Sequence, residues 1–425
     1  MAAELISRSE LQRYCIESES SGDNMRSTPL AMLLVLLIIQ PLVLPVAAAS
    51  WEEDGWLETL GAEERLVAGD EFACHGMPGL SWQADPGAVA TECREYISDR
   101  IAASSWGDQP LSARTPAGLT YIDHALVDDI GFPVHGDLTG LGDTAWHSSN
   151  DEPEQPEDWY NLGRRGGSLE KDMNTVSEVE SEASKGGLLN FYWIGKVGEN
   201  TIRHDSKIEA WLLESDAWFT TWGVAWSTWV IQRCHQFEHD TLSTDADGKW
   251  WFEVSRPAAC QSIEGRAWDV PVTWRINASQ STVSAVVYSE TGESLKQLEV
   301  TENQLQSGWR MDDGHLLLTA PIGTEIEITF EDADVDVDIL DEKWFNGRSF
   351  AVTIASHSTE DLFTWSKRFD ASSDLRFTWL LTPRDVRASS PWLPIVGVVV
   401  ILSSILAFSL IINKDRRYFG STEEE

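Results

Sequence analysis

The apolar segment 394–412 constrains this chain more than any other feature of its sequence. Its 19 residues carry no charge, and a helix that rises about 1.5 Å per residue would cross a hydrocarbon core of about 30 Å with that length. Lys414, Arg416 and Arg417 follow directly, and basic residues beside a span favour the cytoplasmic side. We therefore predict a transmembrane helix over 391–412 and a cytoplasmic tail over 413–425.

The N-terminal region has the pattern of a secretory signal peptide. Met25 and Arg26 precede the apolar run Leu30–Val46, and three alanines follow at positions 47–49. A charged start, an apolar middle and small residues at the cleavage site define such a signal. Residues 1–49 are thus predicted to be a leader with the signal in 25–49. The expected localisation is the cell membrane, with an N-terminal ectodomain outside.

The predicted ectodomain is strongly acidic. Residues 50–390 hold 60 acidic and 25 basic side chains, and the whole chain has a formal net charge of −38. This balance excludes a nucleic-acid partner that binds a broadly basic surface. Only 8 of the 25 basic residues are lysines. Because salt screens the repulsion between like charges, the composition suits a salt-adapted cell surface, although an ordinary acidic extracellular protein is the alternative.

The cysteines predict disulfides. Cys15 lies in the leader, which leaves Cys74, Cys93, Cys234 and Cys260 outside. An even number in an oxidising compartment indicates two bridges. Four cysteines allow three pairings. The local pairing places the smallest demand on the chain geometry, and it joins Cys74 to Cys93 and Cys234 to Cys260. A four-thiolate metal site is disfavoured because no pair has the two-residue spacing of such sites.

Composition and periodicity divide the ectodomain into four regions. Residues 50–147 indicate an α+β region with a helix over 91–103, and 148–187 an acidic linker followed by one amphipathic helix over 168–185. Residues 188–265 form a Trp-rich β region, in which 208–213 is a predicted strand. Its segment 218–231 alternates Trp with Thr and Val, which favours a strand or two, although the Trp spacing also fits one face of a helix.

The fourth region, 266–388, has the pattern of an antiparallel β-sandwich. Short strands recur between tight turns such as Asp313-Gly314 and Asn346-Gly347. The predicted strands are Val270–Ile276, Val283–Tyr288, Leu295–Val300, His315–Thr319, Glu325–Phe330, Val335–Ile339, Phe350–Ala355 and Leu375–Leu381. The predicted fold class is therefore mainly β with an α+β N-terminal region, a membrane-proximal antiparallel β-sandwich and then one C-terminal transmembrane helix.

Three patterns that could hold a metal are weak. Residues 235–239 spell H-x-x-E-H, which binds zinc in inverted zinc peptidases only on a helix, whereas here we predict a solvated strand end or loop. Asp334, Asp336 and Asp338 share one face of a predicted strand, and Asp245 and Asp247 lie in half of a calcium loop. We assign no catalytic, cofactor-binding or metal residue, and a weak, non-catalytic Ca²⁺ site is the alternative.

The sequence favours a binding role over an enzymatic one. The 21 tryptophans are expected to fill the core, with a glycan-binding surface as the alternative. We expect a non-enzymatic binding, adhesion or shielding module, held to the membrane by one helix. Its extracellular ligand is unknown from the sequence, and a glycan or divalent cations are the candidates. The runner-up is a membrane-anchored hydrolase of extracellular polysaccharide or peptide. Its chemistry would come from four residues, namely Asp123, His124, His135 and Asp137. No motif is specific enough to name a family.

Overall fold

The computed structural model describes most of the chain between residues 54 and 384. The described residues are 54–55, 57–136, 160–162, 166–197, 200–201, 203–239, 249–255, 265–278, 281–332, 337–357 and 374–384, with 399, 402 and 403. All of them belong to one compact unit, Ala49–Glu425.

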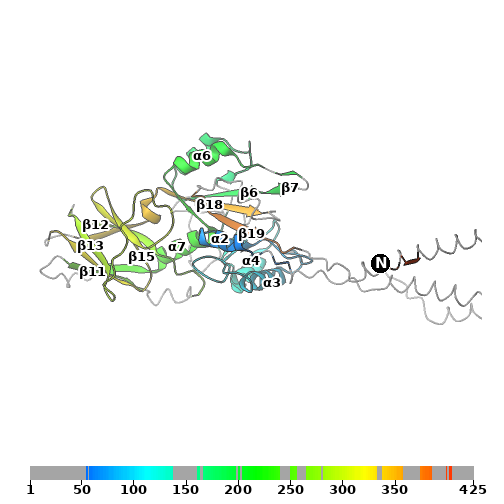
Figure 1. Ribbon diagram of the computed structural model, residues 1–425, viewed down its shortest axis with the longest axis horizontal. Coiled ribbons are helices and arrows are strands. Elements are labelled where there is room, and N and C mark those ends of the chain that lie inside the picture. Colours follow the sequence, from blue (N-terminus) through cyan, green and yellow to red (C-terminus); the bar gives the residue numbers. More distant parts are fainter. Residues whose placement is uncertain are drawn as a thin grey trace, which may run out of the picture. The chain divides into compact units, whose positions relative to one another are not determined.

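A sheet of nine strands, parallel throughout, forms the centre of this unit. Its order is β4-β3-β2-β1-β19-β18-β6-β5, and β9 pairs with β18 as well. Figure 1 shows β6, β18 and β19 side by side. The strands are β1 Glu71–Cys74, β2 Ser112–Ala113, β3 Val134–His135, β4 Tyr160–Asn161, β5 Gly167–Ser168, β6 Leu188–Ile194, β9 Ala217–Thr220, β18 Phe350–His357 and β19 Phe377–Leu381.

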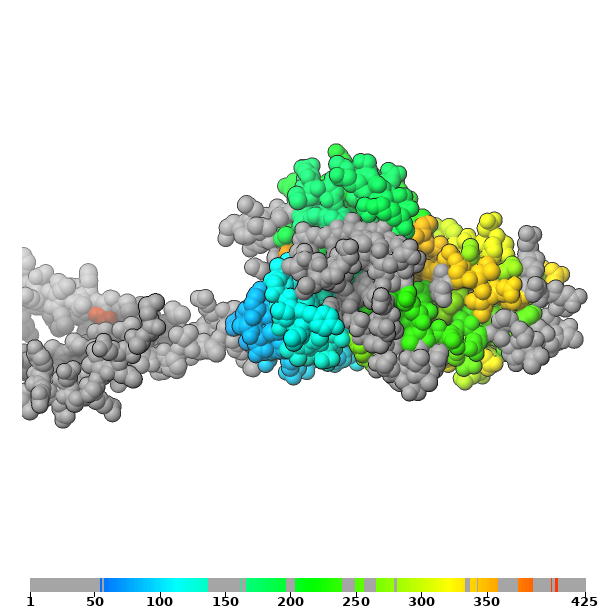
Figure 2. Space-filling model, turned by 180° about the vertical axis from the view of Figure 1, so that it is seen from behind, coloured from blue at the N-terminus to red at the C-terminus, as the bar shows by residue number. Residues whose placement is uncertain are grey.

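Helices cover this sheet. They are α2 Leu60–Val67, α3 Pro86–Ser98, α4 Tyr121–Ile130, α5 Val176–Ala183, α6 Ser206–Glu214 and α7 Trp222–Cys234. Asp85 caps α3 by accepting a hydrogen bond from the amide of Ala88. Helix α7 is apolar on nearly every side and buries ten residues, as expected of a helix inside a core. In the view of Figure 2, the region of α5 and α6 (green) and that of α3 and α4 (blue to cyan) occupy separate areas of the surface.

Strands β9 and β19 share one edge of β18. Strand β9 pairs with Phe350–Thr353, and β19 pairs with the next three residues, Ile354–Ser356. After β9 the chain leaves the sheet as α7, so the first turn of α7 meets β1 and β19. The amide of Gly223 donates to Glu71 Oε2 at 2.8 Å, and the amide of Trp222 donates to Thr378 Oγ1 at 2.9 Å.

Two antiparallel sheets lie between α7 and β18 in the chain. One has the order β10-β11-β16-β13, and the other β14-β15-β12-β17. Phe237 of the first stacks on Trp274 of the second with ring centroids 4.5 Å apart, so the two sheets face each other. Their strands are β10 Gln236–His239, β11 Lys249–Ser255, β12 Val272–Asn277, β13 Val283–Tyr288, β14 Gly308–Asp312, β15 His315–Ala320, β16 Glu325–Phe330 and β17 Asp338–Lys343. A small hairpin, β7 Lys196–Val197 with β8 Asn200–Thr201, and the 3₁₀ turn Phe345–Gly347 complete the described elements.

The predicted fold class is wrong. Antiparallel strands exist, but the segments 350–355 and 375–381, which were predicted to complete a sandwich, are β18 and β19 in the middle of the parallel sheet. All residues of both strands are buried. A short buried strand looks the same in a parallel sheet and in a sandwich core, so the apolar run did not reveal its partners. The chain is α/β at its centre.

Several predicted elements also change type. Segment 208–213 is part of helix α6, and 218–231 is the end of β9 followed by most of α7. The Thr and Val residues that favoured a strand there are buried on all sides of α7, and this tertiary packing outweighs their intrinsic preference. The helix predicted over 168–185 is confined to α5, and 295–300 forms no strand.

The predicted transmembrane helix receives no support. Residues 391–412 lie outside the described residues, apart from Val399, Leu402 and Ser403. No helix in the described part of the chain combines the length and the apolar character needed to span a membrane. The predicted signal peptide, 25–49, also lies outside it.

Candidate functional site

The carboxyl ends of the parallel strands bring four polar side chains together. The chain builds outward from β1 to β2, β3 and β4, and then adds β5, β6, β18 and β19 from the other side. The two halves meet between β1 and β19, and in open α/β sheets ligands bind at the carboxyl ends of strands at such a junction. His75 follows β1, Arg114 follows β2, His357 ends β18 and Thr382 follows β19.

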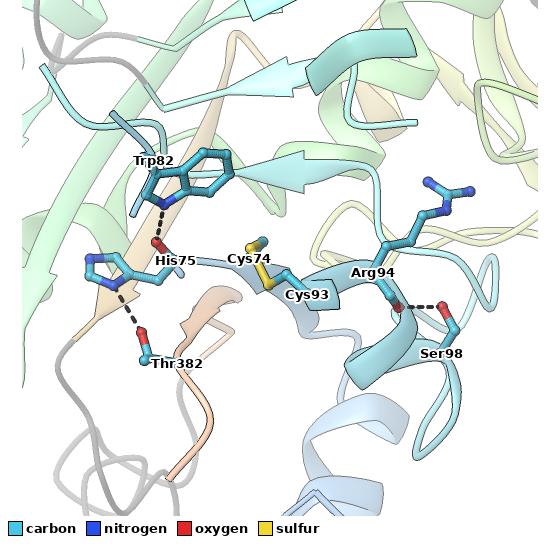
Figure 3. Close-up of a disulfide and its surroundings, with 7 residues drawn as sticks. All are labelled: Cys74, His75, Trp82, Cys93, Arg94, Ser98 and Thr382. Atoms are coloured by element: carbon cyan, nitrogen blue, oxygen red, sulfur yellow. Dashed lines mark hydrogen bonds between the residues drawn. A yellow bond between two sulfur atoms is a disulfide. The ribbon is translucent and has the colours of Figure 1, made fainter. Parts of the chain in front are cut away.

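His75 is the centre of this cluster. Its Nδ1 lies 3.0 Å from Thr382 Oγ1, as Figure 3 shows, and its Nε2 lies 2.9 Å from Arg114 Nη1. Its ring stacks on that of His357 with centroids 5.3 Å apart. A guanidinium can only donate, so Nε2 accepts from Arg114. The ring proton is therefore on Nδ1 and is donated to the hydroxyl of Thr382.

The surroundings keep His75 neutral. Burial, and secondarily the positive charge of Arg114, lower the pKa of His75 from 6.5 to about 4. Arg114 brings a positive charge to this cluster, because a guanidinium stays protonated at neutral pH. The planar guanidinium of Arg114 matches a carboxylate or a phosphate in shape and charge.

A disulfide and a hydrogen bond fix the backbone of His75. The predicted bridge between Cys74 and Cys93 is confirmed, and it ties the end of β1 to α3 with the two Cα atoms 6.0 Å apart. Trp82 Nε1 donates to the carbonyl oxygen of His75 at 2.9 Å, and Figure 3 shows this hydrogen bond and the disulfide close to the His75 backbone. The imidazole is thus held by its neighbours along the chain as well as by Arg114 and Thr382. Cys260, the expected partner of Cys234, lies outside the described residues.

The geometry disfavours nucleophilic catalysis by Thr382. A hydroxyl nucleophile needs a base that accepts its proton, but Nδ1 of His75 donates to Thr382 and Nε2 already accepts from Arg114. The cluster therefore presents a cation and polar groups rather than a base next to a nucleophile. Such a set can hold an anion.

The three described residues among those weighed for a hydrolase do not gather in an open site. His124 of α4 and His135 of β3 do meet, with their Nδ1 atoms 2.8 Å apart, but both residues are fully buried. Burial, and secondarily His124, lower the pKa of His135 to about 3. His135 Nε2 lies 2.7 Å from the carbonyl oxygen of Phe132, to which it donates. Asp123 is exposed and caps α4 together with Thr120. Asp137 lies outside the described residues.

The weak metal patterns gain no support. The H-x-x-E-H segment is on strand β10 rather than on a helix, so its two imidazoles are not one helical turn apart. Asp334, Asp336, Asp245 and Asp247 lie outside the described residues, and Asp338 begins β17. Over the described ranges, no group of three or more His, Cys, Asp or Glu side chains could hold a metal ion.

Several tryptophans have the core-filling role that the sequence suggested. The largest fully buried side chains include Trp193, Trp218, Trp222, Trp226, Trp229 and Trp379. The sequence did not single out the cluster around His75. Each of its members follows or ends a short buried strand, which was the available signal, but only the parallel strand order brings the four together.

The chain matches no protein-family model, and no curated protein and no solved structure shows significant similarity to it.

Proposed function

We propose that the protein is an exported, non-enzymatic binding protein that holds an anionic group at the carboxyl ends of its parallel strands. The observation that carries this proposal is the contact of 2.9 Å between Arg114 Nη1 and the neutral ring of His75. It places a cation at the junction of two half-sheets, where α/β domains bind ligands. A carboxylate or phosphate group is the ligand chemistry that fits this cation.

Binding is favoured over turnover because both nitrogens of His75 are engaged. A general base must reach the proton that it removes, and neither nitrogen of His75 has that freedom. The Cys74–Cys93 bridge supports export, because disulfides persist in oxidising compartments. The net charge of −38 repels anions at long range, so salt at the cell surface would assist the approach of the ligand.

Inorganic phosphate is the probe that tests this proposal. The melting temperature of the purified full-length chain is measured with increasing phosphate, against NaCl of the same ionic strength. We expect phosphate to stabilise the protein beyond NaCl, by about 2.7 kcal/mol at one hundred times the dissociation constant. Arg114→Ala should abolish this difference, and Arg114→Lys should retain part of it.

Lys185→Ala is the matched control, because it removes an exposed cation that pairs with Glu182 on the surface. It should respond to phosphate as the wild type does. If phosphate and NaCl stabilise the wild type equally, or if Arg114→Ala keeps the full phosphate effect, the proposal is wrong.

A further inference from the structure

A cavity lies at the other end of the strands, beside the amino ends of β1 and β19. Its volume is about 110 Å³, and it is open to solvent. Its lining includes Gly69, Trp106, Trp218, Thr220, Leu305 and Arg376. They come from the segments before β1 and β19, from the loop between α3 and β2, from β9, and from the loop between β13 and β14. This cavity shares no lining residue with the cluster around His75.

Thr220 lines the cavity and carries a polar group without a partner among the described residues. The residue is 3% exposed, and this group is its hydroxyl. A buried hydroxyl without a partner costs about 1–3 kcal/mol. A ligand group in the cavity would remove this cost.

Arg376 brings a positive charge to the same cavity. It is 7% exposed, and its Nη1 donates to the carbonyl oxygens of Asp374 and Leu375 at 3.0 Å each. Within the part of the chain that the structure describes, no carboxylate oxygen lies within 4.0 Å of the guanidinium. Nε and Nη2 likewise make no hydrogen bond to a described residue, so they have donors to offer.

Two acidic residues act on Arg376, namely Asp70 and Asp374, and both have other hydrogen-bond partners. Asp374 Oδ2 accepts from Asn303 Nδ2 at 2.9 Å. Asp70 accepts from the amide of Phe377 at 3.0 Å and from Trp379 Nε1 at 2.9 Å, and its nearest cation is Arg65 at 3.7 Å. Gly69 leaves the room that Arg376 needs, because a Cβ there would stand 3.2 Å from Nε of Arg376. Its φ of +93° also favours glycine.

Size and lining define the class of ligand. A cavity of about 150 Å³ holds benzene, so 110 Å³ suits a molecule with a body of a few carbon atoms. Trp106, Trp218 and Leu305 supply apolar wall. We propose that this cavity binds a small organic carboxylate. Its anionic group contacts Arg376 and the hydroxyl of Thr220, and its short hydrocarbon body lies against the apolar wall.

The test uses butyrate and its neutral analogue of nearly the same shape, butyramide. Calorimetric titration of the full-length chain at constant ionic strength should give a dissociation constant for butyrate on the order of 1 mM. Butyramide should bind at least about tenfold more weakly, because it lacks the charge that Arg376 recognises. Equal binding of the two compounds, or no binding of butyrate, would overturn the proposal.

Variants locate the site. Arg376→Gln should weaken butyrate binding about tenfold or more, and Thr220→Val about threefold or more. Thr220→Val replaces an unpartnered hydroxyl with a methyl group of similar size, so the free protein should be at least as stable as the wild type. A loss of binding in this variant therefore cannot be explained by a loss of folding. Arg114→Ala should leave butyrate binding unchanged. Butyrate binding that survives Thr220→Val unchanged, or that disappears in Arg114→Ala, would contradict the assignment to this cavity.

Discussion

The two ends of the same parallel strands differ in the kind of acid or base that they bury. At the carboxyl ends, His75 is neutral because burial lowers its pKa to about 4. At the amino ends, Asp70 and Glu71 are fully buried, and burial raises the pKa of both carboxyl groups. Burial disfavours the charged form in each case. The same physical cause therefore lowers the pKa of a histidine at one end and raises the pKa values of two carboxyl groups at the other.

The two ends consequently respond to pH with opposite signs. Between pH 6.5 and about 4 the unfolded chain protonates His75 while the folded chain does not, so the free energy of unfolding decreases as the pH falls through this window. A buried carboxyl group with a raised pKa keeps its proton in the folded chain after the unfolded chain has lost it. Asp70 and Glu71 thus reduce the free energy of unfolding as the pH rises through their raised pKa values.

At neutral pH, the largest expected effect comes from removing the disulfide that holds the carboxyl end of β1. Replacing both Cys74 and Cys93 by Ala removes a crosslink between residues 19 positions apart, which should lower the free energy of unfolding by about 3 kcal/mol. Denaturant titration of wild type and variant measures this decrease in the free energy of unfolding. Butyrate binding at the amino end should persist below the new transition, and a stability equal to that of the wild type would show that the bridge contributes nothing.

Acid titration tests the neutral histidines. As the pH falls below 6.5, each of His75 and His135 should reduce the free energy of unfolding by up to about 1.4 kcal/mol per pH unit. The decrease should continue to a pH of about 4 for His75 and about 3 for His135. His75→Asn cannot take up this proton, so its stability should depend less steeply on pH. Denaturant titrations at several pH values check this, and parallel curves for wild type and variant would rule the effect out.

A smaller effect is expected from Glu71→Gln at the amino end. The amide can still accept from Gly223, and it can donate to the nearby hydroxyls of Ser112 or Thr221. The variant should become more stable than the wild type by about 1 kcal/mol as the pH rises through the raised pKa of Glu71. Glu64→Gln, which alters an exposed carboxylate of α2, is the control and should show no such trend.

The smallest effect is expected from general screening, which does not distinguish the two ends. Because the chain has a net charge of −38, NaCl should raise the melting temperature by a few degrees as the Debye length shortens from about 10 Å at 0.1 M to about 3 Å at 1 M. His75→Asn and Glu71→Gln should keep this salt response. A melting temperature that is indifferent to salt would exclude the salt-adapted interpretation.

Local patterns predicted some strands closely, but 208–213 and most of 218–231 are helical instead of strands, and the long-range partners were not predicted. The strands 283–288 and 325–330 have the predicted bounds. Each segment contains its own alternating pattern and is flanked by turn residues, so the local sequence is enough to predict it. The direction and neighbours of β18 depend on β6, which is more than 150 residues earlier, and no local pattern encodes them. The site was missed for the same reason: His75 and Thr382 are adjacent only because β1 and β19 pair.

The position of β18 and β19 in the chain has a consequence for the order of folding. The strands that fill the gap between β1 and β6 are synthesised after both antiparallel sheets. At about 5–20 residues per second, the ribosome needs about 8–30 s to make the 155 residues between β6 and β18. During that interval β1 and β6 expose unpaired edges, which invite pairing with other chains. Pulse proteolysis of chains truncated before Phe350 should find the half-sheets sensitive to protease and the antiparallel sheets resistant. A stretch of about thirty residues, synthesised after both antiparallel sheets, thus decides whether the first half of the protein folds or aggregates.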